Sequence, residues 1–62
     1  MHVNLYYCTS VEIIFDDEFK IQMTDSMDNV LSKIRWAFNE YHFTCADVIS
    51  VKTGEIILNA RL

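Results

Sequence analysis

The stretch FKIQMTDSMDNVLSKIRWAFNEYHF, residues 19–43, decides the fold because its apolar spacing changes partway along. The first five residues alternate apolar and polar side chains, which is the period of a strand with one buried face. The side chains of Thr24, Asp25 and Ser26 can accept hydrogen bonds from free backbone N–H groups, so they predict a helix start. Beyond them, apolar residues recur at helical spacing toward an end near His42. The predicted core face of this helix consists of Met27, Val30, Leu31, Ile34, Ala37, Phe38 and Tyr41.

Hairpins are predicted on both sides of the helix. Residues 11–15 (VEIIF) and 19–23 (FKIQM) alternate, and the acidic tripeptide between them is a short polar turn. Residues 2–8 (HVNLYYC) also alternate, either as a separate strand or as the start of one long bent strand. After the helix, KTG at 52–54 separates two runs rich in β-branched residues, which predicts a second hairpin.

The predicted element order is ββ(β)αββ, which belongs to the α+β class. We expect a small single-layer sheet, antiparallel or mixed, with one helix packed across it. Alternation assigns the following residues to the helix-facing side of the sheet: Val3, Leu5, Tyr7, Val11, Ile13, Phe15, Phe19, Ile21, Met23, Val51, Ile56 and Leu58. The outer face would then carry Tyr6, Cys8, Ile14, Val48 and Ile57.

Residues 19–34 (FKIQMTDSMDNVLSKI) resemble the strand–cap–helix segment of ubiquitin-like β-grasp domains. A hairpin, one helix and further strands also match that topology. The resemblance implies a β-grasp-like fold as an alternative. The C-terminal LNARL lacks the diglycine tail of the conjugated members, so conjugation is not implied.

Length and composition predict one compact domain, residues 1–62, with apolar surface to spare. Apolar residues make up 52 % of the chain, and a domain of this size is marginally stable without a disulfide, a metal or a partner. Of the net charge of −4, residues 1–28 carry −5 (six acids, one base) and residues 29–62 carry +1 (three acids, four bases). An acidic half opposes direct binding to nucleic acid or to an anionic membrane. With no signal-peptide pattern and no membrane-spanning run, we expect a cytoplasmic protein, in the host-cell cytoplasm if a phage encodes it.

The chain offers little for catalysis or for binding a cofactor or a metal. The spacing of His42 and Cys45 suits a zinc ligand pair, but His2 and Cys8 would lie about 20 Å apart on an extended strand. There is no Gly-rich phosphate loop, and no recognisable nucleophile–base pattern. We therefore expect no enzyme activity, no cofactor and no metal.

Trp36 is the strongest functional lead in the sequence. At about 100° per residue it lies about 200° around the helix from Ile34, nearly opposite the predicted core face. Phe43 falls near the same side, with cations beside it. Trp and Arg are enriched in interface hot spots. The sequence therefore predicts a protein-contact surface made of Trp36, Arg35, Lys33 and Phe43, with a second apolar surface made of Tyr6, Ile14 and Ile57.

These features predict a small non-enzymatic interaction module, an accessory or inhibitor protein that binds a larger protein and changes its activity. In size and composition the chain is similar to the small inhibitors and antitoxin-like factors that bacteriophages and mobile elements encode. One alternative is an acidic nucleic-acid mimic that blocks a DNA- or RNA-binding protein, its phosphate-like groups being Glu12, Asp16, Asp17, Glu18, Asp25 and Asp28. Another is a structural homo-oligomer, such as a homodimer, that needs no further partner.

Overall fold

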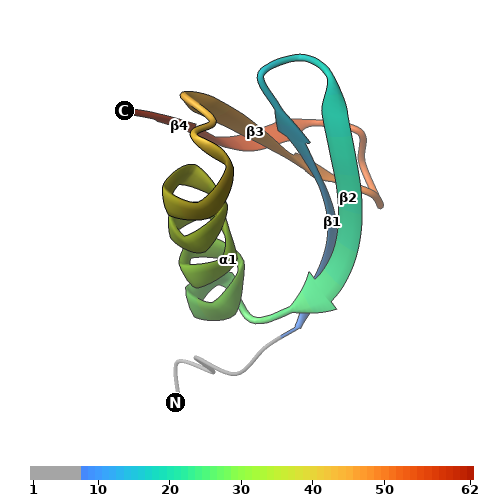
Figure 1. The fold of residues 1–62 in the computed structure, drawn as a ribbon. Coiled ribbons are helices and arrows are strands. Elements are labelled where there is room, and N and C mark those ends of the chain that lie inside the picture. Colours follow the sequence, from blue (N-terminus) through green and yellow to red (C-terminus); the bar gives the residue numbers. More distant parts are fainter. Residues whose placement is uncertain (1–7) are drawn as a thin grey trace.

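A four-stranded antiparallel sheet and one helix make up the fold, which confirms the α+β class (Figure 1). The computed structural model describes residues 8–62. Along the chain the elements are β1 (Thr9–Phe15), β2 (Phe19–Asp25), α1 (Met27–Tyr41), β3 (Cys45–Ser50) and β4 (Ile56–Arg61). The strands lie in the order β2-β1-β3-β4, and α1 crosses the concave face of the curved sheet. The β-grasp alternative is not confirmed, and the strand predicted within residues 2–8 lies outside the described residues except for Cys8, which precedes β1.

The first hairpin forms where it was predicted, with Phe15 opposite Phe19. Asp16 and Asp17 in its turn both have positive φ, 51° and 59°. Aspartate tolerates this left-handed region better than most residues because its short polar side chain can bond locally. The backbone N–H of Glu18 closes the turn by donating to the carbonyl of Phe15 at 3.0 Å.

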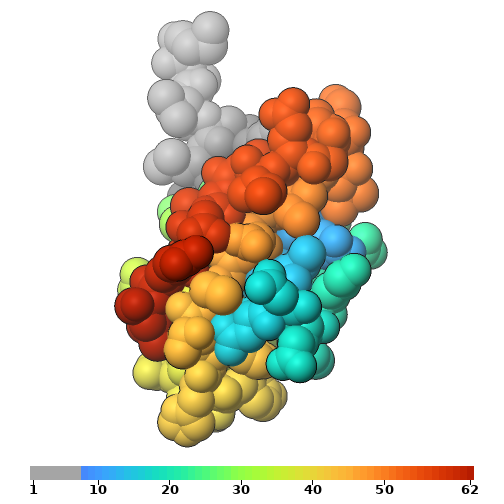
Figure 2. Space-filling view, turned by 90° about the horizontal axis from the view of Figure 1, so that it is seen from above, coloured from blue at the N-terminus to red at the C-terminus, as the bar shows by residue number. Residues whose placement is uncertain are grey.

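The second hairpin joins β3 to β4 and is also confirmed. Gly54 adopts a φ of 76°, which glycine reaches without steric cost. Its N–H donates to the carbonyl of Ser50 at 2.7 Å. Figure 2 shows the orange and red β3–β4 hairpin lying against the blue and teal β1–β2 hairpin, in agreement with the strand order.

The helix begins and ends where the sequence predicted. Ser26 is the N-cap, and its hydroxyl accepts a hydrogen bond from the N–H of Asn29 at 3.3 Å. The carboxylate of Asp25 accepts from the N–H of Ser26 at 2.8 Å and from the side-chain amide of Asn29 at 2.7 Å. At the other end, His42 takes a left-handed conformation (φ 58°), which stops the helix after Tyr41.

The core lies between α1 and the two central strands. Its buried apolar members are Val11, Ile13, Phe15, Val30, Ile34, Ala37, Ala46 and Val48. Val48 was predicted on the outer face, and that prediction is wrong: it is fully buried and lies opposite Ile13 and Leu58. The reason is that β3 begins at Cys45 and turns Ala46, Val48 and Ser50 inward, so that Val51 falls in the exposed turn.

Some residues predicted to be in the core are instead exposed. Leu31 lies at the edge of the apolar stripe of α1, and Tyr41 is the last residue of the helix. Phe19 lies on the edge strand β2, where the helix does not cover it fully. Ile56 was predicted on the helix-facing side, and that prediction is wrong: the register irregularity pairs it with Ile49, on the face of β3 away from the buried Val48. A single helix is narrower than a four-stranded sheet, so Phe19 on β2 stays open to solvent.

Candidate functional site

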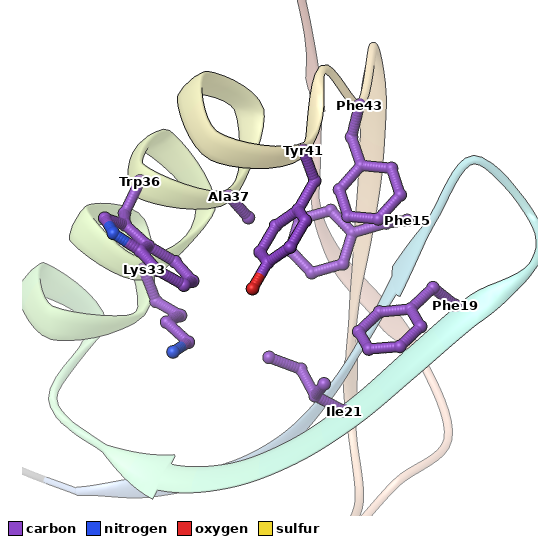
Figure 3. A pocket seen from close by; sticks show the side chains of 8 residues that line it. All are labelled: Phe15, Phe19, Ile21, Lys33, Trp36, Ala37, Tyr41 and Phe43. Atoms are coloured by element: carbon purple, nitrogen blue, oxygen red, sulfur yellow. The ribbon is translucent and has the colours of Figure 1, made fainter.

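A groove with aromatic walls separates α1 from β2 (Figure 3). It encloses about 390 Å³. Trp36 and Lys33 on α1 face Phe19 and Ile21 on β2 across this space. We call this feature the aromatic groove, and its lining consists of Phe15, Phe19, Ile21, Lys33, Trp36, Ala37, Tyr41 and Phe43.

Ring contacts hold the aromatic side chains in fixed relative positions. Phe43 stacks on Phe15 with ring centroids 4.8 Å apart, and on Phe19 at 5.9 Å. Tyr41 lies 5.9 Å from Phe43 and meets Trp36 edge to face at 5.5 Å. Offset-stacked and edge-to-face pairs are the favoured geometries for aromatic rings. The rings therefore form a connected cluster that exists before any partner arrives.

The groove combines a buried floor with exposed walls. Phe15 is 1 % exposed, whereas Trp36, Phe19 and Tyr41 are 45 %, 52 % and 59 % exposed. Large aromatic side chains that remain this open around one cavity form an apolar patch of the kind found at binding sites.

The connection from α1 to β3 brings Phe43 to the groove. The left-handed His42 reverses the chain at the end of the helix. The carboxylate of Asp16 then accepts hydrogen bonds from the N–H groups of Thr44 and Cys45 at 3.0 and 2.9 Å, and from the Thr44 hydroxyl at 3.2 Å. In return, the N–H of Asp16 donates to the carbonyl of Cys45 at 3.1 Å. Asp16 in the first hairpin turn thus holds the start of β3 in place. We call these hydrogen bonds of Asp16 with Thr44 and Cys45 the latch.

The latch predicts how stability depends on acid. Hydrogen bonds from the backbone of Cys45, and then of Thr44, lower the pKa of Asp16 below its ordinary 3.8. The folded state therefore binds fewer protons at Asp16 than the unfolded state, so this contribution is complete above about pH 4 and is lost as the pH falls through the folded-state pKa. We expect Asp16→Asn to lower the urea midpoint at pH 7 and to weaken the loss of stability as the pH falls below about 4.

The matched control for the latch is Asp17→Asn, which removes an equal charge one residue away. It should leave the acid dependence in place because Asp16 still holds Thr44 and Cys45. Urea titrations of the three proteins across this pH range make the comparison. Equal acid profiles for the wild type and Asp16→Asn would contradict the latch.

Charges surround the groove but do not line its floor. The ammonium of Lys33 lies 4.4 Å from the centroid of the Trp36 ring, a cation–π contact that supports the indole. Asp17 and Glu18 are exposed beside Phe19, and Glu40 lies one helical turn beyond Trp36. Acidic side chains therefore lie near the groove on both α1 and the β1–β2 turn, together with the cations Lys33 and the exposed Lys20 of β2.

The structure brings three of the four residues of the first predicted surface together. Lys33, Trp36 and Phe43 all line the aromatic groove. Arg35 instead lines a second groove on the other side of α1, beside Phe38, Arg61 and Leu62. Because each helix position turns the side chain by about 100°, neighbouring residues 35 and 36 point to different sides.

The two residues of the second predicted surface that the structure describes differ in how exposed they are and in what surrounds them. Tyr6 lies outside the described residues. Ile14 is half-buried on β1 with the charged residues Lys20 and Asp47 as its cross-strand partners. Ile57 is exposed on β4 at the irregularity opposite Val48 and Ile49.

Sequence reasoning missed part of the groove's lining. Phe15, Phe19, Ile21 and Tyr41 had all been assigned to the core. One signal in the sequence could have pointed to the groove, namely the position of Tyr41 and Phe43 close to the end of the helix. Aromatic side chains at the end of a helix extend past the region that one helix can bury.

The six carboxylates proposed as phosphate mimics do not form one row. The acidic turn and the pair Asp25 and Asp28 lie at opposite ends of β2, about 20 Å apart at about 3.3 Å per residue. Asp16 belongs to the latch, and Asp25 bonds to the helix start, where the Asn29 side chain and the Ser26 backbone lower its pKa. Glu12 lies mid-strand on β1, opposite Gln22 and Ile49.

Metal-binding groups do not gather in the described part of the chain. Within residues 8–62, no cluster of three or more His, Cys, Asp or Glu side chains could hold a metal ion. The Cys45 thiol is half-buried, and burial is the main cause of its raised pKa.

Within residues 8–62, the helix is too short and too polar to cross a membrane.

Comparison with known protein families, with curated proteins and with solved structures finds no match to this chain. The function is therefore inferred from the aromatic groove itself.

Proposed function

We propose that the protein is a small non-enzymatic interaction module that binds a larger protein through the aromatic groove and inhibits or modulates it. The observation that carries the proposal is the preformed ring cluster, with Trp36, Phe19 and Tyr41 exposed above a buried Phe15. A role as a phage- or mobile-element-type accessory factor in a host cytoplasm is the form that size and composition favour.

The groove has the features of a binding hot spot. Trp and Tyr are among the residues that lose most affinity when truncated, and they concentrate where a partner excludes water from a packed pocket. Here the rings need little reorganisation on binding because Phe43 and Tyr41 already contact their neighbours. Preorganisation lowers the entropy cost of association.

The two alternatives have weaker support. Two of the six carboxylates needed by a nucleic-acid mimic already accept hydrogen bonds within the fold. A homo-oligomer would bury the groove against a second copy, but each copy carries a net charge of −4. The aromatic groove requires neither arrangement.

Salt dependence tests this proposal against the mimic. Once a partner has been captured with the tagged protein, its affinity is measured by calorimetry at low and high salt. An apolar groove should lose less than about fivefold between 50 and 200 mM salt, whereas six phosphate-like contacts would lose about 10³-fold. A steep salt dependence together with competition by nucleic acid would contradict the aromatic groove.

A further inference from the structure

The aromatic groove runs along an open sheet edge. β2 is the outermost strand on its side, and no strand among residues 8–62 pairs with its outer edge. Its pairing with β1 is regular over all seven residues, from Thr9 opposite Asp25 to Phe15 opposite Phe19. The chain has no proline, and β1 and β2 pair residue for residue without a bulge, so two common devices that block an edge are missing from β2.

We propose that the groove receives an extended segment of the partner, which pairs with the free edge of β2 as an additional strand. This inference rests on the proposed function and specifies the partner's chemistry. In this segment apolar side chains alternate with polar ones, and the apolar side chains enter the groove. The segment also carries Lys or Arg near both ends.

The side-chain geometry supports a strand as the occupant. Phe19, Ile21 and Met23 alternate along β2 on the side that faces α1, and Phe19 remains about half exposed. A strand added about 4.8 Å away would turn every second side chain to that same side. There its side chains would meet Trp36 and Tyr41 from the helix (Figure 3). Backbone hydrogen bonds would supply affinity, and the groove would select the apolar side chains.

The charges around β2 favour a basic partner over a second copy. Asp17 and Glu18 precede the strand, and Asp25 and Asp28 end or follow it. If two copies paired antiparallel through β2, the carboxylates of one acidic turn would face those at the far end of the other strand. Like charges opposite each other destabilise a sheet pair. A segment with cations near both ends meets the opposite sign at both ends of β2.

Synthetic peptides test the pairing. The probes are seven-residue peptides of the pattern KITFTIK, with Ile, Val, Leu and Phe varied at the three apolar positions, titrated against the full chain by calorimetry. The tightest binder is then N-methylated either at its apolar positions or at the alternate positions between them. In a strand, the N–H groups of alternate residues point to opposite edges, so only one of these two sets of N–H groups can point toward β2. We expect at least a tenfold loss for one N-methylated version and less than threefold for the other, since each lost backbone bond costs about a factor of five and more than one bond is lost.

The outcomes separate this inference from the proposed function. If both N-methylated peptides bind like the parent while Trp36→Ala weakens binding, the groove binds but strand addition is wrong. If Trp36→Ala binds the parent unchanged, the groove proposal itself fails.

Four other results would overturn the strand-addition inference. The first is that no peptide binds at about 1 mM, and the second is that a peptide with both Lys replaced by Glu binds equally well. The third is that light scattering shows a dimer that the peptide does not dissociate. The fourth is that peptide binding appears only after residues 1–7 are removed. The last two would assign the edge to a second copy or to the chain's own N-terminal segment.

Discussion

Replacing Phe15 with alanine is expected to remove much of the free energy that keeps the protein folded. Phe15 is 1 % exposed, stacks on Phe43 and meets Phe38 edge to face at 6.3 Å. Removing a buried phenyl ring costs about 3–5 kcal/mol, because both the transfer energy and the packing around the cavity are lost. A chain of 62 residues has a total stability of only about 3–9 kcal/mol. One side chain thus accounts for much of the stability of this domain.

Circular dichroism and Trp36 fluorescence during urea unfolding measure this loss. Phe15→Leu keeps part of the ring's volume and should remain folded with a lower midpoint, so the series stays measurable if Phe15→Ala does not fold.

The control variant is Phe19→Ala, at the position directly opposite Phe15 on the neighbouring strand. The two phenylalanines share a residue type, a hairpin and a sheet face, but Phe15 lies on a central strand and Phe19 on an edge strand that leaves it 52 % exposed. We expect Phe19→Ala to cost less than half as much, about 1–2 kcal/mol, because most of the area it could bury is still in solvent. Equal losses would mean that Phe19 is buried and the groove is closed in solution.

Local chemistry explains what the sequence could predict. The N-cap at Ser26, the left-handed stop at His42 and the tight turn after Phe15 each depend on a few neighbouring residues. Such features are encoded within a span of four or five positions, so the start and end of the helix and both hairpins could be predicted correctly.

Errors arose where the outcome depends on how far one element extends over another. Val48 faces inward only because β3 starts at Cys45, and a shift of one residue in a strand reverses every side chain. Tyr41 has the angular position of a core residue, but it lies in the last turn of α1, contacts Trp36 and Phe43, and stays 59 % exposed. Neither fact follows from periodicity within one element.

The candidate site was predictable only in part for the same reason. The helix-surface pattern placed Lys33 and Trp36 on one surface, and both line the aromatic groove. It also included Arg35, which faces the other groove. The opposite wall, Phe19 and Ile21, depends on where α1 crosses the sheet, and that crossing is a tertiary property.

Replacing Trp36 with alanine is expected to weaken binding of the partner by at least about 30-fold while leaving the fold nearly as stable. Hot-spot truncations cost about 2 kcal/mol or more, and 1.4 kcal/mol corresponds to a tenfold change in affinity. In the free protein, Trp36 is 45 % exposed, and its ring contacts Tyr41 and the Lys33 ammonium. Losing such contacts should cost only about 1 kcal/mol of folding stability.

Arg35→Ala gives the sharpest control because it changes the adjacent residue on the same exposed helix, yet faces the second groove. Calorimetric titration of the captured partner with wild type, Trp36→Ala and Arg35→Ala should give a large loss only for Trp36→Ala. If both variants lost affinity equally, the binding surface would extend over the back of α1, as the sequence pattern first suggested. If only Arg35→Ala lost affinity, the partner would occupy the second groove beside Leu62, and the aromatic groove would be an apolar surface left open by a helix narrower than its sheet.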